Sequence, residues 1–206
     1  MSTLVEELGR TFVQADGSFA LASEAMLARW LRRAASLSQA LPNQAVLAYE
    51  TQVAAELEAL AEPPIGQTEV KRMVRQRVGQ QAYRQAMLNY WGDACAVTGL
   101  TLPQALRASH ARPWAECETD AQRLDVFNGF LLSANLDALF DGFLISFSDD
   151  GQLLVSAHLT SAQRSALGLT GHMCLRWVAP DHVPYIRFHR GRFLKSVSTQ
   201  AVLPTP

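Results

Sequence analysis

Residues 108–147, ASHARPWAECETDAQRLDVFNGFLLSANLDALFDGFLISF, form the stretch that decides the fold. Residues 105–109 read as a short strand that ends just before His110. The apolar run Phe130–Leu132 follows an Asn-Gly pair and reads as a second strand. Apolar residues then recur at helical spacing over Ser133–Phe140. The predicted order is therefore strand, loop, strand, helix.

Four polar residues stand out along this stretch. Asn128 lies eighteen residues after His110, Asp137 nine after that, and Asp141 four further on. On a helix, residues i and i+4 project from one face, so the two carboxylates would repel each other unless a cation lay between them. Oxygen ligands favour a hard ion, Mg²⁺ or Mn²⁺, over zinc. In the alternative interpretation, Asp141 pairs with a nearby arginine.

His110 is a candidate general base. An imidazole can take a proton from water at physiological pH, and its position just before a loop leaves the ring free to face a groove. A lone histidine is more often structural, so this interpretation depends on the surrounding pattern. The amide of Asn128 both donates and accepts, so it can tie the loop and orient His110; the alternative is that Asn128-Gly129 is an ordinary turn.

This pattern resembles the HNH endonucleases over roughly residues 71–195. Several short motifs in the right order are a stronger signal than any one of them. They are Cys95–Gly99, Ala108–His110, Pro113-Trp114, Asn128-Gly129, Leu136–Asp141 and Leu144–Phe147.

The resemblance implies a ββα-metal fold that holds one divalent ion beside a phosphodiester. It assigns His110 as the base and Asn128 as the residue that braces the loop. Asp137 takes the place of the third motif residue, and Asp141 matches a second helical ligand found in some members. Ser109 stands where an Asp or His is usual, so a neutral hydroxyl would complete a metal site with fewer charged groups.

Five basic residues are candidates for nucleic-acid binding, because phosphate neutralisation supplies most non-specific affinity. Arginine forks suit phosphate oxygens, although a single arginine is more often part of a surface ion pair. Two of the five, Lys71 and Arg75, lie on the basic face of a helix predicted over residues 68–91. The alternative is that this face is simply a solvated surface. The candidates are Arg112, Arg123, Arg190, Lys71 and Arg75.

Composition restricts the class of protein. The chain has 206 residues, 49% of them hydrophobic and 18% charged, which is typical of a globular protein. No apolar run is long enough to span a membrane, and the N-terminus has no basic region typical of a secretory signal. Three widely spaced cysteines indicate free thiols in a reducing compartment, so we expect a cytoplasmic protein. Residues 1–70 carry a net charge of −5 (four basic, nine acidic), whereas residues 71–206 carry +4 (fourteen basic, ten acidic).

The rest of the chain divides into two predicted domains, 1–66 and 67–206. The first contains helices over 2–16, 20–41 and 44–61, the last of them capped by Asn43, and residues 62–66 cannot continue a helix. After the central stretch, strands over 143–147 and 152–156 flank a hairpin turn. Further elements are predicted at 161–167 (helix), 174–178 (strand) and 181–193 (helix or turn), with a loose tail from about 196.

The sequence therefore predicts an α+β protein with a helical N-terminal segment, a ββα-metal (HNH) nuclease module and an additional β-hairpin. By resemblance it is a metal-dependent endonuclease that hydrolyses DNA phosphodiester bonds in bacterial restriction or anti-phage defence. The alternative is a catalytically inactive ββα module that binds nucleic acid or a protein partner. The helical segment would serve a homodimer or a defence-system partner; the preference for plain DNA, modified DNA or RNA stays open.

Overall fold

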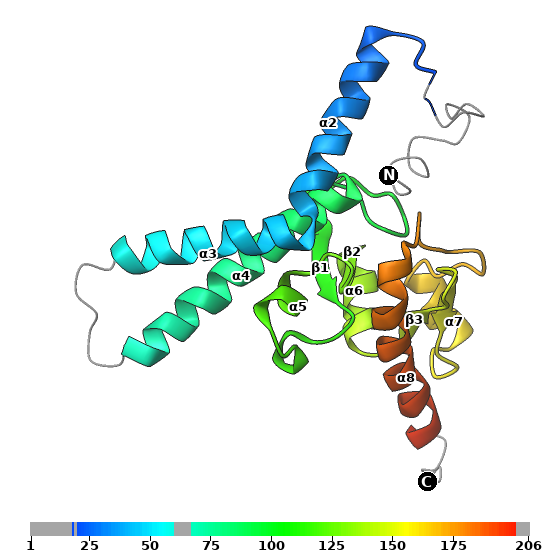
Figure 1. Cartoon of the computed structure of the whole chain (residues 1–206). Helices are drawn as coiled ribbons and strands as arrows, with labels where there is room; N and C mark the ends of the chain where they lie inside the picture. Colours follow the sequence, from blue (N-terminus) through cyan, green and yellow to red (C-terminus); the bar gives the residue numbers. More distant parts are fainter. Residues whose placement is uncertain (1–17, 19, 60–66, 201–206) are drawn as a thin grey trace.

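The computed structural model describes residues 18, 20–59 and 67–200 (Figure 1). The helices over residues 24–91 extend from a compact part that holds the strands and the remaining helices. The predicted helix over 2–16 and the predicted boundary over 62–66 lie outside the described residues, so the division into two domains stays a prediction. The elements in chain order are α2 (Glu24–Ala40), α3 (Pro42–Ala59), α4 (Gln67–Trp91), β1 (Leu106–His110), α5 (Asp120–Leu124), β2 (Gly129–Ser133), α6 (Ala134–Asp141), β3 (Ile145–Phe147), β4 (Leu153–Val155), α7 (Ser161–Ala166) and α8 (Val183–Gln200), with short 3-10 turns at Pro103–Ala105, Trp114–Glu116 and Pro180–His182.

The start of α3 differs from the prediction. Pro42 ends α2 as expected, but it is itself the first residue of α3, and Asn43 lies within the first turn. The N–H groups of Gln44 and Ala45 bond back to the carbonyl oxygen of Leu41, at 2.9 and 3.0 Å. Proline suits this position because its fixed φ is helical and its missing N–H would have no partner there.

Helix α4 joins the N-terminal helices to the strands. The guanidinium of Arg33 on α2 donates to the carbonyl oxygens of Asn89 and Tyr90 near the end of α4. On the other side, Arg84 donates to the carbonyl oxygens of Leu106 at 2.8 Å and Pro103 at 2.9 Å, which fixes the start of β1 against α4. The helix predicted over 68–91 is thus confirmed, and its basic face is partly occupied by these structural bonds.

The central stretch folds as predicted, into two antiparallel strands and a helix. Strands β1 and β2 pair with Ser109 opposite Phe130 and His110 opposite Gly129. Helix α6 follows β2 directly and packs against both strands. Its predicted apolar side is buried: Leu136, Leu139 and Phe140. The order of strand, loop, strand and helix is confirmed, with His110 as the last residue of β1 instead of the first residue beyond it.

The C-terminal part confirms the hairpin and corrects two other predictions. Strands β3 and β4 pair antiparallel across the predicted turn. The strand predicted over 174–178 is only a single bridge, Cys174 to Gln152. Helix α8 continues to Gln200, past the point at which a tail was expected. Helix α8 packs against β3 and buries Ile186, His189 and Phe193, so tertiary packing adds to its helix propensity.

One hydrophobic core connects these elements. It runs from Tyr49 on α3 through the strands to Ile186 on α8. Trp91 stacks on Trp177 with ring centroids 4.4 Å apart, which closes the core beneath the end of α4. The architecture is α+β, as predicted. Across the described parts of the chain, no helix combines the length and apolar character needed to cross a bilayer.

Candidate active site

His110 has a defined orientation at the end of β1. Its Nε2 atom lies 2.8 Å from the carbonyl oxygen of Arg123, which belongs to the loop between the two strands. A carbonyl oxygen only accepts hydrogen bonds, so Nε2 carries the proton in this contact and Nδ1 keeps its lone pair. The ring therefore has one nitrogen held by the backbone and one nitrogen available as a base.

Two aromatic side chains surround His110. Tyr83 of α4 stacks on the imidazole with centroids 3.8 Å apart and an interplanar angle of 19°. Trp114 meets it edge-on at 5.7 Å. Burial beneath these rings lowers the pKa of His110 from 6.5 to about 4, although the bond to Arg123 acts in the opposite direction. The imidazole is therefore neutral at physiological pH, which is the form that accepts a proton.

A pocket of about 390 Å³ opens beside His110. Its wall combines the end of β1, the loop between the strands, the end of α6 and one face of α8. The polar groups on it differ in character: the imidazole of His110, the carboxylate of Asp141 and the guanidinium of Arg192. The lining residues are Ala108, Ser109, His110, Ala111, Pro113, Trp114, Asp141, Phe143, His189 and Arg192.

Ser109 and the two acidic residues of α6 lie together next to this pocket. The hydroxyl of Ser109 donates to Oδ1 of Asp137 at 2.5 Å. Burial and the negative charge of Asp137 raise the pKa of the Asp141 carboxyl. The two carboxylates thus interact unfavourably, as expected for a site that a cation would stabilise.

The donor set fits a hard divalent ion that keeps part of its own water. Mg²⁺ is commonly held by one or two carboxylates together with waters and substrate phosphate oxygens. Asp137 and Asp141 supply that number, and the oxygen of Ser109 lies beside Asp137. No group of three or more His, Cys, Asp or Glu side chains able to hold a metal occurs among the described residues.

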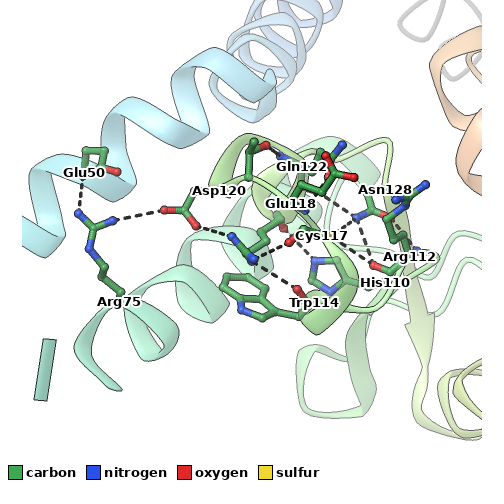
Figure 2. Close-up of polar contacts among 12 residues, drawn as sticks. Glu50, Arg75, His110, Arg112, Trp114, Cys117, Glu118, Asp120, Gln122 and Asn128 are labelled. Carbon is green, nitrogen blue, oxygen red and sulfur yellow. Dashed lines mark hydrogen bonds and ion pairs between the residues drawn. The ribbon is translucent and has the colours of Figure 1, made fainter. Parts of the chain in front are cut away.

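Asn128 holds the loop between the strands from within (Figure 2). Its Oδ1 accepts from the backbone N–H of Arg112 at 2.8 Å, and its Nδ2 lies 3.0 Å from the carbonyl oxygen of Gln122 and 3.3 Å from the sulfur of Cys117. The side chain is fully buried. The loop that carries the carbonyl partner of His110 is therefore closed on Asn128, and the geometry agrees with the bracing function expected of it.

The candidate phosphate-binding arginines occupy different surroundings. Arg123 lies within the loop, where it bonds to the carbonyl oxygens of Trp114 and Cys117 and to the carboxylate of Asp120. The guanidinium of Arg112 lies over the ring of Phe188 on α8, 4.3 Å from its centroid. Arg190 donates to the carbonyl oxygen of Phe147 and to Asp149, outside the pocket lining.

Lys71 and Arg75 line a second pocket of about 620 Å³. Trp114 belongs to the walls of both pockets, so the basic end of α4 lies next to the His110 pocket. Figure 2 shows Arg75 placed between Glu50 of α3 and Asp120 of α5, with which it forms ion pairs at 3.5 and 3.3 Å. Part of its positive charge is therefore compensated within the protein.

Two residues next to His110 were not singled out as site residues from sequence. Tyr83 lies in the helix predicted over residues 68–91, but nothing in that pattern indicated a ring stacked on the imidazole. Arg192 lies in the final helix, and no local pattern distinguishes it from Arg190 or Arg187. Only the way in which α8 packs brings it to the pocket.

Two other buried histidines make stability depend on pH. Burial lowers the pKa of both His182 and His189 from 6.5 to about 4. Folding therefore favours the neutral form of each histidine. The contribution of this preference to the free energy of unfolding is complete above pH 6.5 and is lost as the pH falls toward 4. Asp125 and Asp141, whose pKa values are raised by burial, act in the opposite direction.

We expect the free energy of unfolding, measured with urea, to fall by roughly 1–2 kcal/mol per buried histidine between pH 7 and pH 5. The physical cause is the burial of both rings, with the Phe140 ring stacked on His189 at 3.7 Å. A free energy that stays constant over this range would contradict the prediction.

Comparison with known proteins agrees with the geometry. Residues 95–148 match the family model described as HNH endonuclease. The match spans the turn before β1, both strands of the site, α6 and β3, and it includes His110, Asn128, Asp137 and Asp141. No match to the chain was found among the curated proteins.

Proposed function

We propose, from the membership of residues 95–148 in the HNH endonuclease family, that this protein is a metal-dependent endonuclease that hydrolyses DNA phosphodiester bonds. Family membership supports nuclease activity in general, and DNA as substrate is our proposal. The observation that carries it is the neutral imidazole of His110, anchored through Nε2 and lining the same pocket as Asp141. A base beside an oxygen ligand set is what attack of water on a phosphodiester requires.

In the proposed mechanism, Nδ1 of His110 takes a proton from the attacking water. The carbonyl oxygen of Arg123 holds Nε2–H, so the ring keeps its orientation and the imidazolium that forms is stabilised by a hydrogen bond at 2.8 Å. Asn128 maintains the loop that carries this carbonyl group. Each of these parts acts on His110 through geometry already present in the free protein.

Asp137 and Asp141 would hold Mg²⁺ or Mn²⁺, with Ser109 orienting Asp137 through its hydroxyl and supplying a further oxygen. When bound, the ion would stabilise negative charge on the leaving oxygen. The like-charge interaction between the two carboxylates supports this assignment, because a cation removes it.

Nucleic-acid binding is proposed for the basic residues that the sequence indicated. Lys71 and Arg75 would contact the backbone beyond Trp114, and Arg112 would act beside Phe188. Arg190 would contact DNA only after leaving Asp149. For Arg123 the three internal bonds favour positioning of the loop over direct contact.

The biological setting is a further proposal. We propose restriction or anti-phage defence, with the N-terminal helices serving a second copy of the chain or a partner protein of the defence system. The three cysteines, Cys95, Cys117 and Cys174, are all unpaired. Free thiols are typical of a reducing compartment, which supports a cytoplasmic location.

The direct test is cleavage of supercoiled plasmid in Mg²⁺, in Mn²⁺ and in EDTA. We expect nicked or linear products with either ion and none in EDTA. Cleavage that continues in EDTA would contradict the metal dependence.

A second candidate function is an inactive module that binds DNA, and it is favoured by Ser109, which adds no charge to the ligand set. In that case neither plain nor modified plasmid would be cleaved with any ion, while a labelled duplex would still bind.

Replacing Asp137 by asparagine separates the charge of the site from its shape. The amide can still accept from Ser109, whereas the negative charge that a metal ion needs is gone. We expect the Mg²⁺ concentration for half-maximal cleavage to rise by more than about tenfold. Mn²⁺ binding measured by calorimetry should weaken to a similar extent.

Glu118→Gln is the matched control, because Glu118 is an exposed acid of the neighbouring loop that makes no contact with Asp137 in the described structure. An equal effect of both variants would mean that Asp137 contributes only through long-range charge.

A further inference from the structure

The His110 pocket contains one strong cation. Among the described residues that line it, Arg192 is the one arginine, and no lysine accompanies it. It comes from α8, beyond the matched segment 95–148. Its guanidinium carbon lies over the ring of Phe188, 5.2 Å from the ring centroid, and the side chain lines the pocket.

The partner of Arg192 is an acid that can be displaced. The guanidinium bonds to Glu116 on the 3-10 turn of the loop, with 2.5 Å between Nη2 and Oε2. The two side chains are 41% and 35% exposed. An ion pair this accessible to water contributes little stability, so another anion can replace the carboxylate at small cost.

The negative charge in and beside the pocket means that a bound phosphate needs a cation such as Arg192. Asp141 in the pocket lining and Asp137, which is bonded to Ser109 of the lining, bring two carboxylates, and one divalent ion would balance no more than their combined charge. A DNA phosphate entering beside them would still need a positive partner, and a planar guanidinium matches phosphate oxygens better than an ammonium group does. Arg192 and His189 line the same pocket as His110 and Asp141, so the guanidinium is placed where such a phosphate would enter.

We infer that Arg192 is the phosphate-binding residue of this pocket, and that Glu116 occupies it only until a non-bridging oxygen of the DNA backbone takes its place. The inference rests on the proposed function and names the group that holds its substrate. Arg190, two residues earlier, is held by Asp149 and the carbonyl oxygen of Phe147, away from the pocket lining.

Arg187→Met is a matched control for Arg192→Met. Arg187 lies on the same helix and is also paired with an acid, Asp149 at 2.6 Å, but it does not line the pocket. In steady-state cleavage of a short labelled duplex with Mg²⁺, Arg192→Met should lose about 100-fold in kcat/KM, the range seen when one preorganised charge-stabilising donor is removed. Arg192→Lys, which keeps the charge but not the fork, should lose about tenfold. Arg187→Met should stay within about twofold of the unmodified protein, since a single exposed charge contributes little.

Glu116→Gln distinguishes phosphate binding from a structural ion pair. If Glu116 competes with DNA, its removal lowers KM and leaves kcat unchanged. If the pair only supports the fold, Glu116→Gln loses activity as Arg192→Met does, and the inference is overturned. Anisotropy of the same duplex, measured with His110→Ala as the background to prevent cleavage, should show weaker binding for Arg192→Met and tighter binding for Glu116→Gln.

The outcomes separate the two proposals. If the unmodified protein cleaves DNA and Arg192→Met has the same kcat/KM as Arg187→Met, only the role of Arg192 is overturned. An unmodified protein that cleaves nothing with Mg²⁺ or Mn²⁺ overturns the proposed function and this inference with it. Thermal unfolding of each variant establishes that the measured losses come from folded protein.

Discussion

Replacing His110 by alanine should reduce the rate of DNA cleavage by about 10²–10⁴-fold, the contribution of a positioned general base. The loss follows from geometry. Nδ1 is the ring nitrogen left free by the bond between Nε2 and Arg123, and the ring is neutral at physiological pH because burial lowers its pKa to about 4. The measurement is single-turnover cleavage of supercoiled plasmid with saturating Mg²⁺.

His110→Gln tests the role of the base more specifically than His110→Ala. A glutamine amide reaches about as far as Nε2 and can still donate to the carbonyl oxygen of Arg123, but it has no basic nitrogen. Both variants should therefore be inactive while glutamine preserves more of the fold, as judged by thermal unfolding. A glutamine variant that cleaves DNA at a rate close to that of the unmodified protein would exclude His110 as the base.

Gly129→Ala should strongly destabilise the ββα module. A Cβ atom built at Gly129 would lie 1.9 Å from the backbone oxygen of Ser109 and 2.4 Å from the hydroxyl of Tyr83, and the residue has φ of +153°. Backbone cannot move aside as a flexible side chain can. We expect a loss of about 3 kcal/mol or more, from strain and overpacking together.

Gly168→Ala separates strain from overlap. Gly168 also has a positive φ, +69°, but a Cβ atom there would meet nothing within 4 Å. Its substitution should cost only about 1 kcal/mol. Urea unfolding of the two variants at pH 7 makes the comparison, and equal losses would show that backbone conformation alone, without close approach of Ser109, requires glycine at position 129.

Local pattern determined much of this protein. The spacing of His110, Asn128, Asp137 and Asp141 depends on short elements whose periodicity is visible in the chain: a strand places alternate residues on opposite faces, and a helix places residues four apart on one face. The hairpin around residues 148–151 is equally local. These elements were predicted within one to three residues, because each requires only neighbouring residues to specify it.

Boundaries of helices and strands that depend on tertiary packing were predicted less well from the sequence. The segment 174–178 has the composition of a strand but forms a single β-bridge, at Cys174, while Leu175 and Arg176 donate backbone hydrogen bonds to two different segments, at Gly151 and Ala96. An extended segment becomes a strand only where one continuous edge is available. Helix α8 was expected to end near residue 193, yet burial of Ile186, His189 and Phe193 supports a longer helix. Neither property can be read from the segment alone.

The chemical environment of the site was decided by tertiary structure. The sequence identified His110 as a base by its position, but the free nitrogen is specified by Arg123, thirteen residues away, and the neutral state by Tyr83 on α4. Similarly, three arginines of α8 are equivalent in the sequence, and the rotation of the helix against Phe140 and β3 turns Arg192 toward the pocket and Arg190 toward Asp149. Sequence thus determined which residues can perform the chemistry, because chemical type and local spacing are written in the chain. Tertiary structure determined their protonation and partners, because both depend on burial and contacts between segments that are distant along it.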